Sequence, residues 1–505
     1  MLNKNDIKKS LKKLISGTDI RGISIETDEF KENLTCNVAA LLGYGFLNWL
    51  KINKNEKENI KIAIGMDSRI SGPKLKKALI ETLADEGVEV YDCGIATTPS
   101  MFMATILDGY KCTGSIMITA SHLPYYYNGF KFFTSSGSCE KNDIEEMIEL
   151  SIIEKEKIIE RGIVNKVNLL DDYSNILINK VRKEVDSDEN YNEPLEGINI
   201  LVDAGNGAGG FFANKVLKNL GANIEGSQFL NPDGRFPNHI PNPENDEAMM
   251  AIKNAVLNNK ADIGIIFDTD VDRAAIVSKN GNEINKNSLI ALVSAIVLDK
   301  NKGAVIVTDS ITSTGVKKFI EDLGGVHHRY KRGYKNVINE AKRINKLGKN
   351  CPLAIETSGH AALKENYFLD DGAYLIVKIL IEVAKLFKEG KDITLLIKGL
   401  EHPLENKEIR IKIKNEDYID YGNKVIDNLK KFVSQIEEWE VEPNNYDGIK
   451  INCIKEKGWF ILRLSLHEPL LVLNLESNSK NGIEQIIDKL KDYLSNYYEL
   501  EFRTN

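Results

Sequence analysis

Hydrophobic and polar positions along about the first 400 residues follow two alternating patterns. Short runs rich in Ile and other apolar residues, at 60–64, 115–118 and 265–267, each end in polar residues or glycine. Runs of this length predict buried strands that lead into loops. Longer segments lie between them, and one of these, residues 74–85, follows a proline suited to the first turn of a helix. Strands that alternate with helices predict a mostly parallel sheet covered on both faces.

About the last hundred residues follow a different pattern, with the change near residues 401–406, where Pro403 interrupts the preceding segment. Adjacent apolar strands joined by short turns indicate an antiparallel sheet with helices on one side, which is an α+β domain. The predicted strands are 409–413, 448–454, 459–464 and 470–475, and the predicted helices are 418–432 and 482–494.

The strand at 115–118 leads into the sequence Thr-Ala-Ser-His-Leu-Pro at 119–124. In α/β proteins ligands sit at the carboxyl ends of parallel strands, so Ser121 is expected at the edge that carries an active site. Taken alone, a serine in a loop is more often a residue that makes a turn hydrogen bond. The functional interpretation therefore depends on a second motif.

That second motif follows the strand at 265–267 and places Asp268, Asp270 and Asp272 at alternate positions. Three carboxylates this close repel one another, and a hard divalent cation with oxygen ligands relieves the repulsion. A calcium loop of the EF-hand type is excluded, because Arg273 stands where its glycine is needed and Lys279 where its bidentate Glu is needed. An ordinary solvated acidic turn is the alternative to the Mg²⁺ site that we predict.

A glycine-rich segment, Gly-Asn-Gly-Ala-Gly-Gly at 205–210, offers a rival interpretation. It matches G-x-G-x-x-G between a predicted strand and a predicted helix at 211–220, and Glu225 follows about 20 residues later. By pattern alone this is an NAD-binding fingerprint of an oxidoreductase. That interpretation leaves Ser121 and the acidic triplet without a role, and a tight turn with close helix–sheet packing explains the glycines equally well.

Composition narrows the class of protein. With 42% hydrophobic and 28% charged residues the chain is an ordinary globular protein. A net charge of -8 argues against nucleic-acid binding. Six scattered cysteines without a Cys-x-x-Cys pair suggest neither zinc nor disulfides and favour a reducing cytoplasm. No apolar run of about 18 residues and no signal peptide is found, so no membrane association is expected.

The serine loop and the acidic loop together resemble the α-D-phosphohexomutase family, in its phosphomannomutase/phosphoglucomutase type. In that family the phosphoserine loop reads Thr-Ala-Ser-His-Asn-Pro and the metal loop reads Asp-Gly-Asp-Gly-Asp-Arg. This chain keeps the reacting and ligating positions, with Leu123 in place of Asn and with Thr269 and Val271 in place of the two glycines.

Further segments match the family in its own order. Residues 17–22 resemble the N-terminal arginine loop, residues 65–73 another family segment, and Glu-Thr-Ser-Gly-His at 356–360 the sugar-binding loop, with Asp-Asp-Gly at 370–372 after it. Two departures stand out: Tyr334 occupies a position where relatives often have His, and Leu466 and His467 replace a small or polar turn in the last domain.

The resemblance covers nearly the whole chain and implies an α/β protein of four domains. Three related mixed or parallel-sheet α/β units would be followed by a small α+β domain of the TATA-binding-like kind. The expected domains are a phosphoserine-loop domain at 1–160, a metal-binding domain at 161–286, a sugar-recognition domain at 287–402 and a phosphate-binding lid domain at 403–505.

The activity that the resemblance implies is interconversion of hexose 1-phosphate and hexose 6-phosphate through a phosphoserine and a hexose 1,6-bisphosphate, with Mg²⁺. Lys131 is preferred over Arg21 as general acid or base, because an ammonium shifts its pKa readily whereas a guanidinium stays charged. The expected catalytic residues are Ser121, His122, Lys131 and Arg21; the expected substrate-binding residues are Glu356, Ser358, His360, Tyr334, Arg273, Arg463, Ser465 and His467; the expected metal ligands are Ser121, Asp268, Asp270 and Asp272.

The residue between Glu356 and Ser358 makes the sugar loop resemble mannose and glucose phosphate mutases more than glucosamine enzymes. Phosphoglucosamine mutase, and a relative that binds sugar phosphate without turnover, stay as alternatives beside the oxidoreductase. The expected partners are small hexose phosphates, the protein being a monomer or a homodimer.

Overall fold

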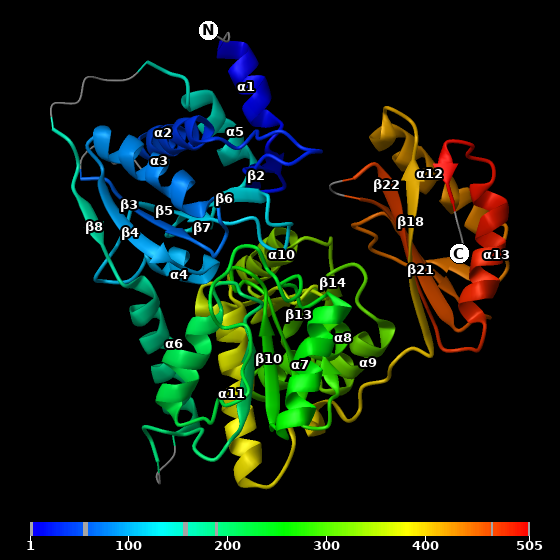
Figure 1. Cartoon of the computed structure of the whole chain (residues 1–505). Coiled ribbons are helices and arrows are strands. Elements are labelled where there is room, and N and C mark those ends of the chain that lie inside the picture. The colour runs from blue at the N-terminus through cyan, green and yellow to red at the C-terminus, as the bar shows by residue number, and fades with distance from the viewer. Residues whose placement is uncertain (1–3, 54–58, 155–159, 187–189, 466–467, 503–505) are drawn as a thin grey trace. The chain divides into compact units, whose positions relative to one another are not determined.

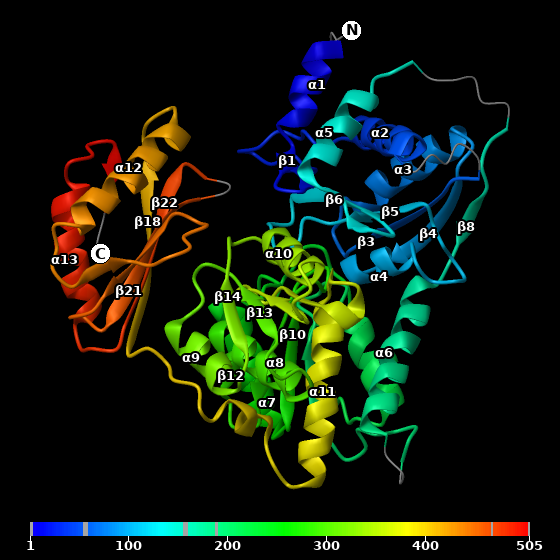
Figure 2. The ribbon, with the colours of Figure 1, turned by 180° about the vertical axis from the view of Figure 1, so that it is seen from behind.

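The computed structural model describes residues 4–53, 59–154, 160–186, 190–465 and 468–502. The chain forms two compact units, of which unit 1 comprises Met1–Ile296 with Ser358–Leu396 and unit 2 comprises Val297–Thr357 with Ile397–Asn505. Figures 1 and 2 show the ribbon of both units from opposite sides. Each unit is described separately.

The N-terminal part of unit 1 is an eight-stranded mixed sheet in the order β1-β2-β6-β5-β3-β4-β8, with β7 paired to β6. Strands β3, β4, β5 and β8 are parallel to their neighbours in this group, whereas β6 runs antiparallel to both β5 and β2. The strands are β1 Ile15–Ser16, β2 Asp19–Ile23, β3 Lys61–Met66, β4 Glu89–Ile95, β5 Gly114–Ile118, β6 Tyr127–Thr134, β7 Gly137–Ser138 and β8 Val164–Lys166. The helices are α1 Lys4–Lys12, α2 Cys36–Asn53, α3 Gly72–Asp85, α4 Thr98–Met103 and α5 Lys141–Leu150.

Helices cover this sheet because glycines in its central strands let them approach closely. A Cβ at Gly114 of β5 would lie 2.6 Å from the Phe46 ring of α2. A Cβ at Gly65 of β3 would lie 2.5 Å from the Met101 sulfur of α4. Helices α2 and α3 lie above the strands in Figure 1, and α4 lies below them. The buried Ile, Leu and Phe side chains between these layers form one continuous core.

The second part of unit 1 is built on a four-stranded sheet in the order β12-β11-β10-β9. Its central strand β10 is buried along its whole length, pairs parallel with β9 and ends at the acidic loop. The strands are β9 Ile200–Asp203, β10 Ile263–Phe267, β11 Ala274–Ser278 and β12 Glu283–Ile284, and the hairpin β16 Ala361–Leu363 and β17 Leu369–Asp370 also belongs to unit 1. The helices are α6 Leu169–Val185, α7 Asp246–Asn259, α8 Lys286–Lys300, which continues into unit 2, and α11 Gly372–Lys388, with short turns at Phe212–Leu217 (π), Lys218–Leu220, Lys364–Asn366 and Ile393–Ile397.

Unit 2 contains a parallel group of strands and an antiparallel sheet. The parallel group is β14-β13-β15, formed by β13 Val305–Thr308, β14 Val326–Arg329 and β15 Leu353–Ile355 with helices α9 Thr314–Asp322 and α10 Tyr334–Lys346. The antiparallel sheet has the order β19-β20-β21-β22-β18-β23, and its core is packed against two helices. Its elements are β18 Glu405–Ile413, α12 Tyr418–Val433, β19 Trp439–Val441, β20 Ile449–Cys453, β21 Gly458–Leu464, β22 Leu470–Ser477, α13 Gly482–Leu494 and β23 Leu500–Glu501.

The predicted fold class is confirmed, with three α/β sheets followed by an α+β domain. Two local predictions were wrong. The charged pattern at 143–161 predicts a helical stretch, but the helix α5 ends at Leu150, and the helix expected at 211–220 is a π-helical turn followed by a 3₁₀ turn. The four domain boundaries stay predictions.

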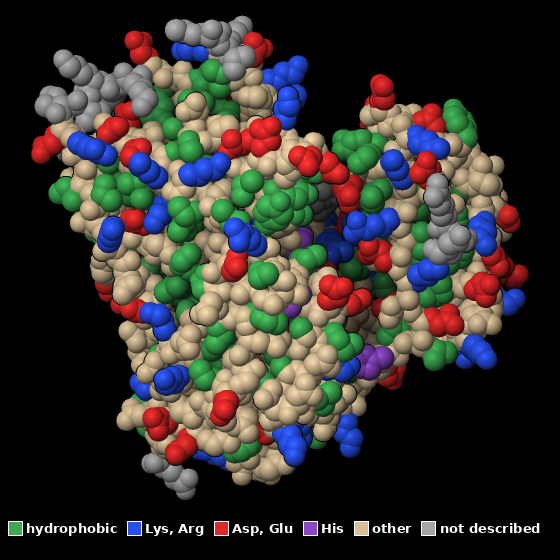
Figure 3. Space-filling view, viewed as in Figure 1, with side chains coloured by type: hydrophobic (Ala, Val, Ile, Leu, Met, Phe, Trp, Pro, Cys, Tyr) green, Lys and Arg blue, Asp and Glu red, His purple; other side chains and the backbone are tan. Residues whose placement is uncertain are grey.

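The surface and the helices agree with the composition. Lys and Arg side chains are interspersed with Asp and Glu on the face of each unit shown in Figure 3. Among the described residues, no helix is both long and apolar enough to cross a membrane.

Candidate active site

The serine loop begins where β5 ends, and its backbone is held in an unusual conformation. Ser121 has φ +51°, in the left-handed region that non-glycine residues rarely adopt. Its backbone N–H donates to the Thr119 hydroxyl at 2.9 Å, and the residue is buried. Strain of this kind persists only where surrounding contacts impose it, and it is concentrated at functional sites.

The acidic loop begins at the end of β10 and brings its three carboxylates together in a buried cluster. Asp268, Asp270 and Asp272 each offer an oxygen, and these oxygens lie within 4.8 Å of one another. Val271 turns the chain between them with φ +65°. The Ser121 hydroxyl donates to Asp268 Oδ2 at 3.1 Å, so the two loops, 147 residues apart in sequence, meet as predicted.

The electrostatics of the carboxylate cluster are uneven. Burial, followed by the charges of Asp272 and Asp270, raises the pKa of Asp268 well above its usual value. Burial opposes ionisation of Asp272 too, but the Lys131, His360 and Arg273 charges outweigh it and lower the pKa of Asp272 below its usual range. The cluster therefore contains more negative charge than burial favours, unless cations balance it.

The oxygens of the carboxylate cluster are suited to bind a hard divalent cation. Asp270 Oδ1 and Asp272 Oδ1 are buried and accept no hydrogen bond from any described residue. Their other oxygens are occupied, because Lys131 Nζ lies 3.2 Å from Asp270 Oδ2 and 2.5 Å from Asp272 Oδ2. Buried carboxylate oxygens without donors are costly, and oxygen ligands of this kind are those that Mg²⁺ prefers.

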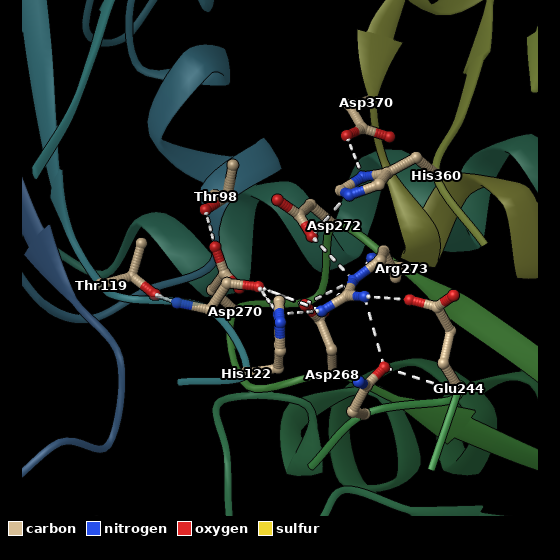
Figure 4. A network of polar contacts seen from close by, with 12 residues as sticks. Thr98, Thr119, His122, Glu244, Asp268, Asp270, Asp272, Arg273, His360 and Asp370 are labelled. Carbon is tan, nitrogen blue, oxygen red and sulfur yellow. Dashed lines mark hydrogen bonds and ion pairs between the residues drawn. The ribbon is translucent and has the colours of Figure 1, made fainter. Parts of the chain in front are cut away.

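Arg273 connects the acidic loop to the serine loop, as Figure 4 shows. Its guanidinium donates to Asp268 Oδ2 at 3.2 Å and to the Ser121 hydroxyl at 3.2 Å. On its other side it donates to Asn242 at 3.2 Å and to Glu244 at 3.3 Å. Burial disfavours the charge, but Asp268 and the other carboxylates outweigh burial and raise the pKa of Arg273 further. A permanent positive charge therefore lies beside the Ser121 oxygen.

His122 is held neutral beside this arginine. Arg273 donates to His122 Nδ1 at 2.7 Å, so that nitrogen must carry a lone pair. Burial, followed by the charges of Arg273 and Arg21, lowers the pKa of His122 to about 2. An imidazole in this environment accepts a hydrogen bond and does not carry charge near neutral pH.

His360 has the opposite character. Its Nδ1 pairs with Asp370 and lies 3.8 Å from Asp272 Oδ1. Burial alone would lower its pKa, but Asp370 and Asp272 reverse the effect and raise the pKa of His360 to about 9. The sugar loop thus adds a further cation, besides Lys131 and Arg273, at the edge of the acidic cluster, and Asp370 is a further member of the site (Figure 4).

The remaining predicted residues of unit 1 lie close to this centre. Arg21 donates to Asp19 at 3.0 Å and contributes to the lowered pKa of His122. Lys131 lies on β6, directly across from Met117 of β5 in the antiparallel register. Ser358 is buried in the segment that returns to unit 1.

The other predicted residues belong to unit 2. Glu356 Oε1 accepts a hydrogen bond from the Gly333 N–H at 2.5 Å, and Tyr334 is the next residue, the first of α10. Arg463 is buried at the end of β21, and burial, followed by the Arg332 charge, lowers its pKa. The Ser465 hydroxyl accepts from the Glu468 N–H at 3.3 Å. His467 and Leu466 lie outside the described residues.

Sequence reasoning missed Thr98, Asn242 and Glu244. The Thr98 hydroxyl donates to Asp270 Oδ2 at 2.5 Å, and the Thr98 N–H donates to the Asp270 carbonyl at 2.9 Å. Thr98 follows strand β4, so the rule that directed attention to Ser121 could also have found it. Asn242 and Glu244 lie in a loop that its prolines and asparagines predict, but no local pattern places them beside Arg273.

The space beside the glycine-rich segment at 205–210 is occupied by other parts of the protein. A Cβ at Gly207 would lie 2.7 Å from the Thr269 carbonyl oxygen of the acidic loop, and a Cβ at Gly209 would lie 3.1 Å from Phe267. A Cβ at Gly210 would lie 2.0 Å from the Leu230 carbonyl. The glycines therefore allow close packing between loops, which removes the structural basis of the dinucleotide interpretation.

Three α/β domains, a serine beside three buried carboxylates, and a terminal α+β domain define one class of protein, and comparison with known families agrees. Residues 12–158, 173–281 and 285–402 match the three alpha/beta/alpha domains, I, II and III, of phosphoglucomutase/phosphomannomutase. The chain belongs to this family, and the predicted resemblance is confirmed.

Individual relatives extend the similarity over nearly the whole chain. A phosphoglucomutase from Neisseria gonorrhoeae is 30% identical over 478 residues, covering 94% of this chain and 95% of the relative. A phosphoglucomutase/phosphomannomutase from Thermococcus kodakarensis is 30% identical over 488 residues, with 95% and 97% covered. The crystal structure of a phosphoglucomutase/phosphomannomutase family protein from Burkholderia thailandensis matches with a TM-score of 0.78 and 26% identity, covering 99% of this chain and 100% of that chain.

Proposed function

We propose that the protein is a phosphohexomutase that interconverts hexose 1-phosphate and hexose 6-phosphate, with mannose and glucose preferred. It acts as an intramolecular phosphotransferase through phosphorylated Ser121. The observation that carries this proposal is the position of the Ser121 oxygen, 3.1 Å from Asp268 and 3.2 Å from Arg273 at a cluster of three buried carboxylates. The names of the full-length relatives support the same activity.

The proposed residues for a Mg²⁺ ion are Ser121, Asp268, Asp270 and Asp272. When bound, the ion neutralises charge on the transferring phosphoryl group. Thr98 fixes one carboxylate oxygen of Asp270, and Arg273 supplies permanent positive charge beside the serine oxygen. Phosphoryl transfer needs positioning and charge neutralisation above all, and these residues provide both.

In the first step the sugar hydroxyl attacks the phosphorus of phosphoserine 121. The bond between phosphorus and the serine oxygen breaks, a bond to the sugar oxygen forms, and hexose 1,6-bisphosphate results. Lys131 is the candidate for both proton transfers: it gives a proton to the departing serine oxygen and takes up the proton of the sugar hydroxyl, so that it ends the step with its charge restored. The bisphosphate then reorients and returns its other phosphoryl group to Ser121.

The substrate must be held in two orientations, and different residues are proposed for its sugar hydroxyls and for its phosphate. Glu356, Ser358 and His360 bind sugar hydroxyls, with Tyr334 beside them. Arg463 and Ser465 bind the phosphate that does not react, because a guanidinium suits phosphate oxygens. His467 and Arg21 stay further candidates for phosphate contacts.

The finer properties are inferred from the same chemistry. The substrates are small hexose phosphates, hexose 1,6-bisphosphate is the activator, and the protein is a monomer or homodimer. A cytoplasmic location is inferred because all six cysteines are described as thiols without disulfides. Phosphoglucosamine mutase activity and sugar-phosphate binding without turnover are the alternatives that the experiment must separate.

The experiment combines coupled assays with intact mass. Mannose 1-phosphate, glucose 1-phosphate and glucosamine 1-phosphate are each supplied with Mg²⁺ and catalytic hexose 1,6-bisphosphate. We expect turnover of the first two, a mass increase of one phosphate on the wild type, and neither in Ser121→Ala with an unchanged circular dichroism spectrum. Preference for glucosamine 1-phosphate would identify the alternative mutase, and no turnover on any sugar would overturn the proposal.

A further inference from the structure

Arg69 is a buried arginine outside the catalytic cluster, in the loop between β3 and α3. Its exposed fraction is 1%, and arginine side chains are rarely buried to this extent unless their charge is paired. A buried guanidinium carries five N–H donors, and each of them requires an acceptor. The direction in which these donors point therefore reveals what the side chain holds.

The donors point at the backbone of the serine loop. Arg69 Nη2 donates to the Ser121 carbonyl at 2.5 Å and to the Leu123 carbonyl at 2.6 Å. Arg69 Nη1 donates to the Pro124 carbonyl at 2.8 Å and to the Tyr127 carbonyl at 3.0 Å. One side chain thus binds four carbonyls within seven residues, including that of Ser121 itself.

Other residues fix Arg69 in place. Its backbone N–H donates to Asp67 Oδ1 at 2.9 Å, and its Nε lies 3.3 Å from Asp67 Oδ2 in an ion pair without hydrogen-bond geometry. The Phe236 ring lies against the guanidinium, 5.2 Å from its carbon. A Cβ at Gly234 would lie 2.6 Å from the Arg69 Cα, so the loop that carries Phe236 is closely packed here.

The serine loop needs such a contact for two reasons. The left-handed conformation of Ser121 is strained, and strain persists only when neighbouring contacts impose it. The four carbonyls would lose these donors without Arg69, and the loss is costly for any of them that is buried. Within the loop itself, the Ser121 N–H bond to the Thr119 hydroxyl and short turn bonds such as Leu123 N–H to the Ala120 carbonyl also oppose relaxation.

We propose that Arg69 is a positioning residue for Ser121, which fixes the serine loop so that the hydroxyl points at Asp268 and Arg273. The proposal rests on the proposed function, since it assigns Arg69 a part in phosphoryl transfer. A purely structural role would change only the fraction of folded protein. A positioning role predicts that the rate of phosphoryl transfer also depends on the four carbonyl contacts. The side-chain hydrogen bonds of Arg69 described above go to backbone carbonyls, and Asp270 of the carboxylate cluster acts on Arg69 through its charge.

The test compares Arg69→Lys and Arg69→Met with a control of matched stability. Ile148 is fully buried in α5, in the hydrophobic core of the same sheet. Ile148→Val and Ile148→Ala cause a smaller and a larger loss of stability, so one of them can be matched by Tm to the Arg69 variants. Kinetics are measured at a temperature where every variant is folded.

We expect kcat to fall at least about a hundredfold in Arg69→Met, with KM changed less than about threefold, because misplacement of a reacting group by about 1 Å costs that much. Arg69→Lys, with a single ammonium, restores only part of kcat because it cannot bind four carbonyls. The matched Ile148 variant keeps wild-type kcat. Equal kcat losses in the Arg69 and Ile148 variants, or no loss in Arg69→Met, would overturn the proposal.

A second measurement separates this proposal from the proposed function. Hydrogen exchange of the amides at 119–127 is followed in unphosphorylated wild type, Arg69→Met and the matched Ile148 variant. We expect exchange to accelerate at least about tenfold in Arg69→Met alone. If wild type turns over no sugar phosphate, the proposed function fails, and unchanged exchange in Arg69→Met shows separately that Arg69 does not hold the loop.

Discussion

At the scale of single residues, the site separates two histidines that the sequence could not distinguish. His122 accepts from Arg273 and is neutral, whereas His360 pairs with Asp370 and has a pKa raised to about 9. Both are partly buried, so the difference comes from their partners, one a cation and the other an anion. Neither histidine therefore changes its charge across the middle of the physiological pH range.

His122→Gln tests the assignment of a neutral histidine. Gln keeps an acceptor for Arg273 and cannot titrate, so we expect kcat/KM within roughly tenfold of wild type. The pH dependence of kcat/KM between about pH 5.5 and 8.5 should keep its shape, because the pKa of His122, lowered to about 2, lies outside this window. Loss of a limb of the profile in the variant would show that His122 does titrate there.

Thr98 provides a prediction about metal affinity. Its hydroxyl donates to Asp270 Oδ2, the oxygen that Lys131 also approaches. The other oxygen, Asp270 Oδ1, accepts no hydrogen bond from a described residue and is the one available to a metal ion. Loss of such a supporting hydrogen bond typically weakens metal binding about 10–100-fold. We therefore expect Thr98→Val to need that much more Mg²⁺ for half-maximal activity, in a titration of enzyme first stripped with EDTA.

The control for this variant is Thr105→Val. The Thr105 hydroxyl is buried too, but it donates to the Phe102 carbonyl one turn earlier in the chain. Its removal should lower stability and leave the Mg²⁺ requirement unchanged. A similar shift in both variants would mean that Thr98 acts on stability and not on the carboxylate.

At the scale of elements, the strands that end at Ser121 and at Asp268 could be predicted because each is a short apolar run with an abrupt polar end. The strand β6 could not, because Asn128 and Gly129 at its start are turn residues and Lys131 within it is charged. Its position between β2 and β5 supplies partners on both sides, and this long-range pairing overrides local preference. The ion pairs of Lys131 join it to residues about 140 positions away. They also depend on long-range structure and could not be predicted from the local sequence.

The glycine loop yields a prediction at this scale. In Gly207→Ala the new methyl group would meet the Thr269 backbone, which cannot move without displacing Asp268 and Asp270. Overpacking of this kind costs about 1–3 kcal/mol. We expect a lower Tm and a higher Mg²⁺ requirement together, measured by thermal unfolding and by metal titration of activity.

Gly109→Ala is the matched control for this variant. A Cβ at Gly109 has no neighbour within 4 Å, and its φ lies outside the left-handed region. The substitution should leave both measurements close to wild type. A Gly207→Ala enzyme with normal metal affinity would show that the acidic loop does not depend on the glycine turn.

At the scale of the whole molecule, the chain has two compact units, so its unfolding need not be a single transition. The partners described above for the serine and acidic loops lie within unit 1. Substitutions in these two loops are therefore expected to act on the stability of unit 1, and a titrating group buried in unit 2 should affect the transition of unit 2.

Lys450 is such a group. It is fully buried on β20, with its Nζ 3.6 Å from the centre of the Trp459 ring, 3.9 Å from Glu442 Oε2 and without a hydrogen-bond partner among the described residues. Burial and then the Arg329 charge lower the pKa of Lys450 to about 7. The charged groups that act on it come from several elements, and they are Arg329, Glu442, Glu476 and Lys317, with the half-buried His327 on the same strand as Arg329.

A lowered pKa means that folded unit 2 binds fewer protons than its unfolded chain between about pH 7 and 10.5. Its stability should therefore rise with pH above about 7, with a slope of up to about 1.4 kcal/mol per pH unit for one proton. The window from about pH 7 to 8.5 isolates the effect of Lys450. The pKa of His327 is lowered to about 3, so the change in stability that His327 causes is complete below this window. Urea unfolding monitored by tryptophan fluorescence measures this slope, since two of the three tryptophans, Trp439 and Trp459, lie in unit 2.

Lys450→Met removes the titrating group while keeping a long apolar side chain against Trp459. In this variant the unit 2 transition should become nearly independent of pH across the window, and at pH 7 it should lie at higher urea than in wild type, because no charge is buried. Lys455→Met, at an exposed position of the next turn, should keep the wild-type slope. A wild-type transition without a pH slope, or an unchanged slope in Lys450→Met, would show that Lys450 stays charged and that the Trp459 ring and Glu442 are sufficient to hold an ammonium inside the domain.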